Sequence, residues 1–516
     1  MRLNSFLNDR WVDGTGEGTA LHDPVTGEEI ARASGEGLDL KAALEHARAV
    51  GGPALRSMTF AERGALIRAI ADVLTANRER YTAIALQNSG NTPGDAALDV
   101  DGGIGTLKYY AALGKGLGAA THLVDGAPER LTKEEAFQAV HVMTPLRGVA
   151  VHINAFNFPS WGLWEKVAVA FLAGVPVLAK PATATALLSQ TMVQDVVEAE
   201  VLPKGVLSLL CGGGRDLMDH VTGQDAVAFT GSADTARMLR GHPNVIANTV
   251  RFTIEADSLN AIVLGPDATP ETAEFGLFIR EVVREMTVKA GQKCTAVRRI
   301  IVPSDRIDSV CAALSEKLAG IRLGNPAEEG VRMGPLVSAR QKQAALEGIA
   351  ALAAETSVVF EGQAQALSEA GFFVTPRLLR CDSPTEAKAV HAVEVFGPVA
   401  TVMPYDGPEE AFALVARGGG SLVASVFTAD DGFARAAALE MAVHHGRLLI
   451  VDDSIGRGHS GHGVVMPQCS HGGPGRAGGG EELGGLRGMA FYSQRTAIQA
   501  NAARIAALVE AGAAWR

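Results

Sequence analysis

The feature that most constrains the fold is a regular alternation, from Arg147 onward, of short apolar segments and longer amphipathic ones. Short apolar runs rich in β-branched residues indicate buried strands, and longer stretches between them indicate helices. Strands are predicted at 148–154, 175–179, 206–210 and 226–229, and helices at 161–172, at 187–200 and from Ser232. This alternation predicts an α/β fold with a parallel, doubly wound sheet, which binds ligands beyond the carboxyl ends of its strands.

A second series of the same kind begins near Glu271, with a helix that ends near Ala290, a strand over 299–302 and a helix over 305–318. A chain of 516 residues is too long for one hydrophobic core. We therefore expect a second domain of similar architecture.

The N-terminal part is predicted to be helical. Thr59 and Glu62 have the spacing of a capping box, which predicts a long helix that runs to about Tyr81. A further helix is predicted over 105–117, after a turn rich in glycine and aspartate.

Composition excludes several classes of function. The formal net charge of −11 leaves no basic surface for nucleic acid or anionic lipid. The N-terminus lacks the apolar core of a signal peptide, and no later stretch is long and apolar enough to span a bilayer. The five cysteines are odd in number and lack metal-ligand spacing, so we expect a reducing, cytoplasmic compartment and no metal site.

Cys294 is the first candidate for chemistry. It lies in the run GQKCT at 291–295, where a loop after a helix would leave the thiol accessible. A thiol needs a nearby cation, a helix N-terminus or a base to react as a thiolate near neutral pH. Taken alone, a cysteine after a helix is more typical of simple packing.

Two segments in the first domain are further candidates. Phe229, Gly231 and Ser232 stand where a strand runs into a helix, which suits either a pyrophosphate site or a simple turn with Ser232 as N-cap. Glu255 stands at the end of an apolar strand, where it could serve as a general base or as a solvated surface carboxylate.

Together these segments resemble the aldehyde dehydrogenase superfamily over nearly the whole chain. The resemblance depends on an ordered set of motifs: FLNDRWVDG at 6–14, NAFNFP at 154–159, AKPA at 179–182, FTGS at 229–232, Glu255, GQKC at 291–294 and EVFGP at 394–398. Their joint presence in this order makes a non-catalytic relative that only keeps the fold a poor alternative.

The resemblance implies catalytic roles for four residues. Cys294 would attack the aldehyde carbon, and the Asn157 amide with the Cys294 backbone N–H would form an oxyanion hole. Glu255 would activate the water that hydrolyses the resulting thioester. Glu482, in the run EELG at 481–484, would relay protons to that water.

The resemblance also implies a nicotinamide cofactor. Lys180 would hold the adenosine ribose and the Phe229–Gly231–Ser232 turn the pyrophosphate, while Glu394 would hold the nicotinamide ribose and Phe396 pack on the nicotinamide. Many NAD-preferring members have a glutamate three residues after this lysine, where this chain has Thr183. A carboxylate would repel a 2′-phosphate that a hydroxyl can donate to, so NADP is the expected cofactor, with NAD as the alternative.

A second departure follows Glu255, where the family commonly reads ELGGK and this chain reads EADSLN at 255–260. That run, the segment 157–166 and the glycine-rich segment 471–482 resemble the semialdehyde dehydrogenases of aerobic, CoA-thioester degradation of aromatic compounds. This implies a small-molecule aldehyde substrate linked to CoA. The alternatives are a general aliphatic aldehyde dehydrogenase and a CoA-acylating one, although Glu255 favours hydrolysis.

The resemblance further implies a domain plan and an oligomer. A discontinuous cofactor-binding domain is expected over 1–134 and 153–270, a catalytic domain over 271–485, and an oligomerisation arm with a C-terminal tail over 135–152 and 486–516. A two-stranded arm near 136–143 and a C-terminal strand near 489–492 would make a homodimer, or a dimer of dimers. A helix is predicted from Thr496, and the non-periodic segment 456–485 is expected to be a functional loop or to pack on the active site.

Overall fold

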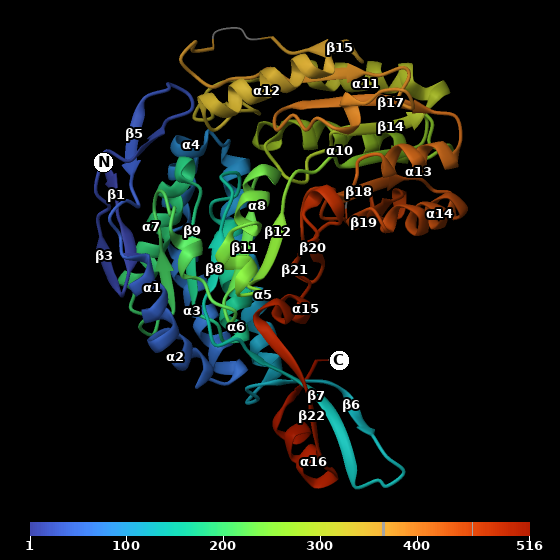
Figure 1. The fold of residues 1–516 in the computed structure, drawn as a ribbon. Coiled ribbons are helices and arrows are strands. Elements are labelled where there is room, and N and C mark those ends of the chain that lie inside the picture. Colours follow the sequence, from blue (N-terminus) through green and yellow to red (C-terminus); the bar gives the residue numbers. More distant parts are fainter. Residues whose placement is uncertain (364–366, 457, 516) are drawn as a thin grey trace.

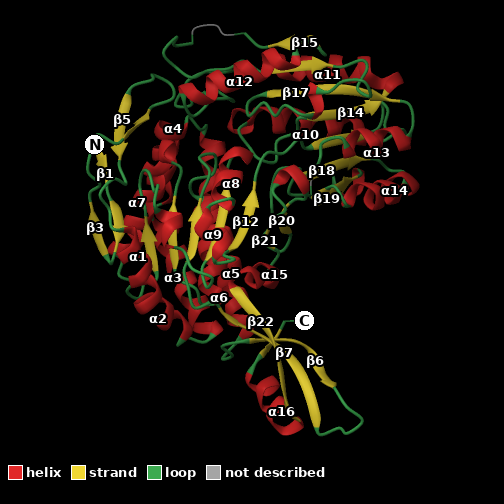
Figure 2. Ribbon diagram, viewed as in Figure 1, coloured by secondary structure: helices red, strands yellow, loops and turns green. Residues whose placement is uncertain are grey.

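Two seven-stranded sheets, each with helices on both faces, lie beside one another, and an arm projects from the first (Figures 1 and 2). The structure is a computed structural model and describes residues 1–363, 367–456 and 458–515. The α/β prediction is confirmed for both halves of the chain.

The first sheet has the strand order β12-β11-β8-β9-β10-β2-β3. Neighbours from β12 to β10 are parallel, and the two N-terminal strands are added antiparallel at one edge. The strands are β2 (Ser5–Leu7), β3 (Arg10–Val12), β8 (Ala150–Ile153), β9 (Val177–Lys180), β10 (Leu207–Leu209), β11 (Ala226–Thr230) and β12 (Arg251–Glu255).

Helices cover both faces of this sheet, because its strands are apolar on both sides and must be buried twice. The helices are α1 (Leu40–His46), α2 (Gly52–Arg56), α3 (Phe60–Ala76), α4 (Arg78–Ser89), α5 (Pro93–Leu117), α6 (Trp161–Ala173), α7 (Ala186–Glu198), α8 (Ala233–Arg240) and α9 (Pro243–Ala247). Across the described residues, no helix has both the length and the apolar character needed to cross a membrane.

The N-terminal helices differ from the prediction at two points. The capping box at Thr59 begins α3 as predicted, but α3 ends at Ala76 and α4 starts at Arg78. Asn77 breaks the helix because its side-chain amide donates to the Val73 carbonyl and its backbone leaves the helical region. The helix predicted over 105–117 begins twelve residues earlier, at Pro93, where Thr92 and Asp95 form a capping box, and its glycines allow close packing against α6. A Cβ atom on Gly102 would lie 2.1 Å from the Trp161 ring.

The second sheet has the order β15-β16-β17-β14-β13-β18-β19, and only β15 is antiparallel to its neighbour. The strands are β13 (Ala261–Leu264), β14 (Arg299–Pro303), β15 (Ser357–Glu361), β16 (Arg377–Arg380), β17 (Val399–Tyr405), β18 (Ser421–Phe427) and β19 (His445–Val451). Its helices are α10 (Ala273–Thr287), α11 (Ile307–Ala319), α12 (Ala339–Leu352), α13 (Pro408–Ala416) and α14 (Asp431–Ala442).

The strand pairing in the structure differs from several of the predicted domain boundaries. β13 pairs with β14 and β18, so the chain enters the second sheet between Glu255 and Ala261, before the boundary expected at 270. β8 pairs with β9 and β11 of the first sheet, although 135–152 was assigned to the arm. β6 (Leu123–Arg130), assigned to the first domain, pairs with the arm strand β7. Short apolar strands look alike in sequence whichever sheet receives them.

The arm is a four-stranded sheet of order β22-β7-β6-β23, in place of the two-stranded arm expected. Its further strands are β7 (Phe137–Pro145), β22 (Ser493–Asn501) and β23 (Ala513–Ala514), and α16 (Ala502–Ala511) packs on it. The strand expected near 489–492 is instead α15 (Leu486–Met489) with a short 3-10 turn, and the helix expected from Thr496 begins at Ala502.

Two small sheets complete the fold. β1 (Arg2–Leu3), β4 (Thr19–His22) and β5 (Glu29–Ala33) form one near the N-terminus. The glycine-rich segment 456–485 contains a hairpin of β20 (Ser470–Gly472) and β21 (Glu481–Leu483). The hairpin lies between the first sheet and the second (Figure 1), so this segment packs at the junction of the two domains.

Candidate active site

One cavity brings together three of the side chains predicted to be catalytic. Asn157, Glu255 and Cys294 all line a cavity of about 530 Å³. Asn157 follows the carboxyl end of β8, Glu255 is the last residue of β12, and Cys294 lies in a loop after α10. The cavity therefore lies where a doubly wound sheet is expected to bind ligands.

The loop that carries Cys294 begins with an unusual backbone. Lys289 and Ala290 have φ values of 53° and 52°, in the left-handed region that residues with a Cβ atom rarely adopt. Both residues are buried, so the surrounding packing holds this conformation. The turn redirects the chain from the end of α10 into the cavity.

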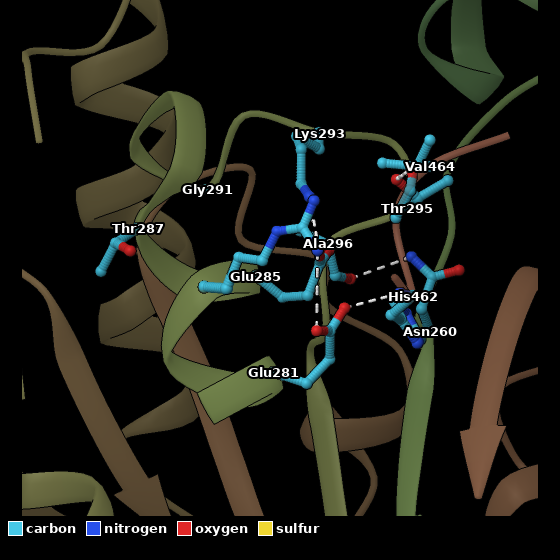
Figure 3. Close-up of polar contacts among 12 residues, drawn as sticks. Asn260, Glu281, Glu285, Thr287, Gly291, Lys293, Thr295, Ala296, His462 and Val464 are labelled. Atoms are coloured by element: carbon cyan, nitrogen blue, oxygen red, sulfur yellow. Dashed lines mark hydrogen bonds and ion pairs between the residues drawn. The ribbon is translucent and has the colours of Figure 1, made fainter. Parts of the chain in front are cut away.

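Asn260 holds the backbone on either side of the thiol. Its side-chain amide donates to the Cys294 carbonyl at 2.8 Å and to the Ala296 carbonyl at 2.9 Å. Figure 3 shows Asn260 directed toward this loop from the start of β13. Asn260 belongs to the run 255–260, which departs from the family pattern. Through Asn260, this run holds the backbone of the cysteine loop in place.

The neighbours of Cys294 are anchored as well. Lys293 Nζ lies 2.6 Å from Glu285 Oε1 of α10, and both side chains are buried. On the other side, the Thr295 hydroxyl donates to the Gly463 carbonyl at 3.0 Å. These contacts tie the loop to α10 and to the glycine-rich segment (Figure 3), so the thiol is held from both directions.

Glu255 is buried among groups that favour its ionised form. Its Oε2 lies 3.3 Å from His471 Nε2. A carboxylate oxygen of Glu255, an imidazole nitrogen of His471 and the Cys294 sulfur all lie within 4.8 Å of one another. Burial alone would raise the pKa of Glu255, but His471, Lys166 and a hydrogen bond from Cys294 outweigh it and lower that pKa to about 2. Glu255 is therefore a carboxylate at neutral pH.

The thiol has the opposite tendency. Burial, followed by the Glu255 carboxylate, raises the pKa of Cys294 above its ordinary value. The resting pair is therefore a neutral thiol next to a carboxylate that can accept its proton. The imidazole of His471 completes the group, because Glu255 raises the pKa of His471 in spite of its burial.

Glu482, predicted to relay protons, lies in a second buried ion group. Its Oε2 is 2.9 Å from Lys166 Nζ, and Lys166 Nζ is 3.4 Å from Glu165 Oε1. Burial raises the pKa of Glu165 to about 7, against the attraction of Lys166. Glu165 and Lys166 also line the cavity with Cys294, so titratable groups continue from the thiol toward Glu482.

The hairpin β20–β21 positions both His471 and Glu482. The two residues lie opposite each other in its antiparallel ladder. Residues that face each other in this way project on the same side of a sheet. One hairpin thus contacts Glu255 through His471 and Lys166 through Glu482.

Sequence reasoning assigned no role to three cavity residues, Asn154, Glu165 and Lys166, while His471, expected from the sequence to line the substrate tunnel, does line the cavity. A signal was present for two of them, because Glu165 and Lys166 are the only charged residues of α6, which is buried over nearly its whole length. Asn154 lies within a recognised motif, and neither its side-chain nitrogen nor its oxygen has a hydrogen-bond partner among the described residues. Nothing local in the sequence pairs His471 with Glu255.

The predicted adenosine-end residues lie together. Lys180 ends β9, and Thr183 begins the short 3-10 turn that follows it. Burial lowers the pKa of Lys180. The segment after β10 passes close by, since a Cβ atom on Gly214 would lie 3.7 Å from the Lys180 side chain, and the next residue, Arg215, is exposed.

The turn from β11 to α8 fits a phosphate group. Ser232 is the N-cap of α8, and a Cβ atom on Gly231 would lie 2.6 Å from the Phe229 ring, so glycine lets that ring pack against the turn. Asp257 is an unexpected neighbour, because its carboxylate accepts the Ala233 N–H at 3.0 Å. At the start of α8, the Ala233 N–H is therefore taken by a carboxylate, and the Thr235 N–H donates to the Ser232 hydroxyl at 3.4 Å.

The predicted nicotinamide-end residues lie near the Cys294 loop. Glu394 accepts the Ser258 N–H at 3.0 Å, and burial raises the pKa of Glu394 to about 7 against the attraction of Arg298. The Phe396 ring stacks with the Arg298 guanidinium at 5.5 Å and meets Phe156 edge-on. With Lys180 and the α8 turn, these residues fit a dinucleotide extended along the first sheet toward the thiol.

Comparison with known proteins agrees with this geometry. The sequence profile of the aldehyde dehydrogenase family matches residues 11–498. The chain is 55% identical to the 3,4-dehydroadipyl-CoA semialdehyde dehydrogenase of Aromatoleum evansii, over 92% of this chain and 93% of that protein.

Solved structures share the fold. PnpE from Pseudomonas sp. WBC-3 is 25% identical, covers 97% of this chain and 98% of its own, and superimposes with a TM-score of 0.84. A point mutant of betaine aldehyde dehydrogenase from Staphylococcus aureus, solved in complex with NAD⁺, is 25% identical, covers 97% of both chains and has a TM-score of 0.83. The chain belongs to the aldehyde dehydrogenase family.

Proposed function

We propose that this enzyme oxidises an aldehyde to a carboxylic acid with NADP, through a thiohemiacetal and a thioester on Cys294. The observation that carries the proposal is the convergence of Cys294, Glu255 and Asn157 on one cavity, where nucleophile, base and amide donor share the same space.

Formation of the thiohemiacetal uses the contact between Cys294 and Glu255. As the sulfur bonds to the aldehyde carbon, Glu255 accepts the thiol proton, and the carbonyl electrons move onto the oxygen. The Asn157 amide and the Cys294 backbone N–H stabilise that oxyanion. When NADP is bound, it would supply the acceptor for the hydride that leaves the aldehyde carbon.

Hydrolysis of the thioester uses Glu255 a second time. After Glu255 has released the thiol proton, it takes a proton from water and the hydroxide bonds to the acyl carbon. The carbon–sulfur bond then breaks to release the acid, and the Cys294 thiolate takes the proton back from Glu255. His471 and Lys166 keep Glu255 ionised, and Lys166 with Glu482 offers an exit for the proton. A base next to the thiol supports hydrolysis over acyl transfer to CoA.

His471→Gln is expected to shift the acid limb of the pH–rate profile upward. With His471 present, the pKa of Glu255 is about 2, so the carboxylate persists through the working pH range. Without the imidazole, burial raises that pKa, and activity falls as the pH drops through the higher value. The measurement is kcat against pH, with His141→Gln, an exposed arm residue, as control. An acid limb that does not move would contradict the electrostatic role of His471.

The preference for NADP rests on the charges around Lys180. Thr183 adds a hydroxyl after Lys180, and the exposed Arg215 follows Gly214, which lies close to the Lys180 side chain. Among the described residues, no carboxylate forms an ion pair with Lys180 or Arg215. A 2′-phosphate gains from donors and cations and loses from carboxylates.

Thr183→Glu is expected to reverse the cofactor preference, because the new carboxylate would repel the 2′-phosphate and accept a hydrogen bond from a 2′-hydroxyl. The measurement is the ratio of kcat/KM for NADP to that for NAD. Thr183→Val is the matched control: it removes the hydroxyl without adding charge and should lower the ratio less. An unmodified enzyme that already prefers NAD would overturn the cofactor proposal.

For the substrate we propose a CoA-linked semialdehyde, specifically 3,4-dehydroadipyl-CoA semialdehyde, oxidised during aerobic benzoate degradation. Support comes from the 55% identity to the Aromatoleum evansii enzyme of that name. The test compares kcat/KM for CoA-linked semialdehydes and for free aliphatic aldehydes. Formation of an acyl-CoA at the oxidised end, when CoA is added, would favour the CoA-acylating alternative instead of hydrolysis.

We further propose a homodimer built through the arm. β22 is the edge strand of the arm sheet and is mostly exposed, and β19 is the edge strand of the second sheet. Open strand edges are templates for pairing with another chain. Sedimentation analysis should show a dimer, and Ala497→Pro in β22 should weaken it; a monomer at every concentration would contradict the proposal.

A further inference from the structure

A large groove lies next to the catalytic cavity and shares one lining residue with it. The groove has a volume of about 2300 Å³ and lies along α10, between that helix and the first turns of α5. Trp161 lines both the groove and the cavity. Val464 of the groove lies between Gly463 and Val465 of the cavity. The groove and the cavity are therefore neighbours, with Trp161 on the boundary between them.

The lining combines an apolar floor with cations. Leu98, Trp161, Ile279 and Val283 contribute apolar surface. The cations are Arg280 and Arg284 of α10, Lys317 of α11, and Arg332. Arg280 and Arg284 are one helical turn apart, so their side chains emerge on the same side of α10.

The charge of the groove is positive although the whole protein is negative. Its two carboxylates are engaged elsewhere, since Asp101 pairs with Arg78 at 2.6 Å and Asp95 caps the start of α5. Among the described residues, neither Arg280 nor Arg332 forms an ion pair with a carboxylate, and both are exposed. Arg280 donates one hydrogen bond to the Gly456 carbonyl at 2.7 Å, but neither guanidinium group has a carboxylate partner in the described part of the chain. Two such cations on an apolar groove fit a ligand that has phosphates at one end and an uncharged chain at the other.

We propose that this groove binds the CoA part of the substrate, with Arg280 and Arg332 on its phosphates and the pantetheine chain over the apolar floor. The proposal rests on the CoA-linked substrate proposed above. The acyl chain passes Trp161 to bring the aldehyde carbon to Cys294. A second hollow shares Gly276 and Arg280 with the groove and is also lined by Asp453, so the phosphates are expected on the groove side of Arg280.

The test uses Arg280→Glu/Arg332→Glu, with Arg435→Glu as matched control. Arg435 is exposed on α14, which packs on the other face of the second sheet from α10. The readouts are the ratio of kcat/KM for a CoA-linked semialdehyde to that for hexanal, and calorimetric binding of acetyl-CoA and 3′-dephospho-acetyl-CoA at saturating NADP. The double variant is expected to lower the ratio about tenfold or more and to weaken acetyl-CoA binding, as removal of charge-assisted phosphate contacts does. Arg280→Gln/Arg332→Gln, which reverses no charge, should show a smaller loss in the same direction.

The outcomes separate the two proposals. If the unmodified enzyme treats the CoA-linked semialdehyde and hexanal alike and does not bind acetyl-CoA, the substrate proposal fails. If the unmodified enzyme prefers the CoA-linked substrate but the double variant keeps the same ratio and the same acetyl-CoA affinity, the groove is the wrong place and the substrate proposal stands. Competition of acetyl-CoA with NADP instead of with the aldehyde would also overturn the groove.

Discussion

Cys294→Ala is expected to lower aldehyde turnover by about 10⁴-fold or more, the size typical for loss of a catalytic nucleophile. The physical reason is that Cys294 is the only cysteine among the described residues that line the cavity, and its thiol lies beside Glu255. Steady-state formation of NADPH measures the effect. The loop should keep its shape in this variant, because Asn260 holds the Cys294 carbonyl and not its side chain.

Two controls make this result specific. Cys469→Ala removes an exposed cysteine from the glycine-rich segment and should leave turnover unchanged. Affinity for NADP, measured by calorimetry, should be similar in Cys294→Ala and in the unmodified enzyme. Turnover that survived in Cys294→Ala would rule out the thiohemiacetal and reopen a role for the fold without this chemistry.

Glu255→Gln is expected to lower steady-state turnover by about 10²- to 10⁴-fold, the range for removal of a general base. Glutamine keeps the shape of the side chain but cannot accept a proton from water, so the thioester on Cys294 should accumulate. Rapid mixing should then show a burst of NADPH of up to one equivalent per active site, followed by a slow phase. Intact-protein mass spectrometry should find the acyl group on the enzyme.

The size of the burst decides how Glu255 is used. A full burst means that the thiol can lose its proton without Glu255, and a slowed burst means that Glu255 also accepts the thiol proton. Glu481→Gln, an exposed neighbour on β21, is the matched control and should behave like the unmodified enzyme. A steady-state rate in Glu255→Gln close to that of the unmodified enzyme would contradict the role of base.

Much of the fold followed from local pattern, and its errors have a common cause. The alternation after Arg147 predicted the doubly wound sheets, because apolar runs and amphipathic helices are local signals. The capping box at Thr59 fixed a helix start for the same reason. The assignment of β13 to the second sheet, and of 493–501 to an arm strand, depends on partners far along the chain that no local pattern records.

The site divides in the same way. Cys294, Glu255 and Asn157 were found because they lie in motifs at strand ends and after helices, and the structure places them around one cavity. The roles of Asp257 and His471 could not be predicted. Each depends on a contact across the fold, Asp257 with the start of α8 and His471 with Glu255.

The pairing of His471 with Glu482 in the β20–β21 hairpin limits how this enzyme can vary. The two residues serve different partners but share one ladder, and a shift of one residue in a strand turns its side chains to the opposite face. A one-residue shift of β20 would therefore remove the imidazole from the base, and a one-residue shift of β21 would remove the carboxylate from Lys166. Among relatives, the length of this glycine-rich turn should therefore vary less than its residues do. A relative with a turn of different length should keep its base ionised by other contacts.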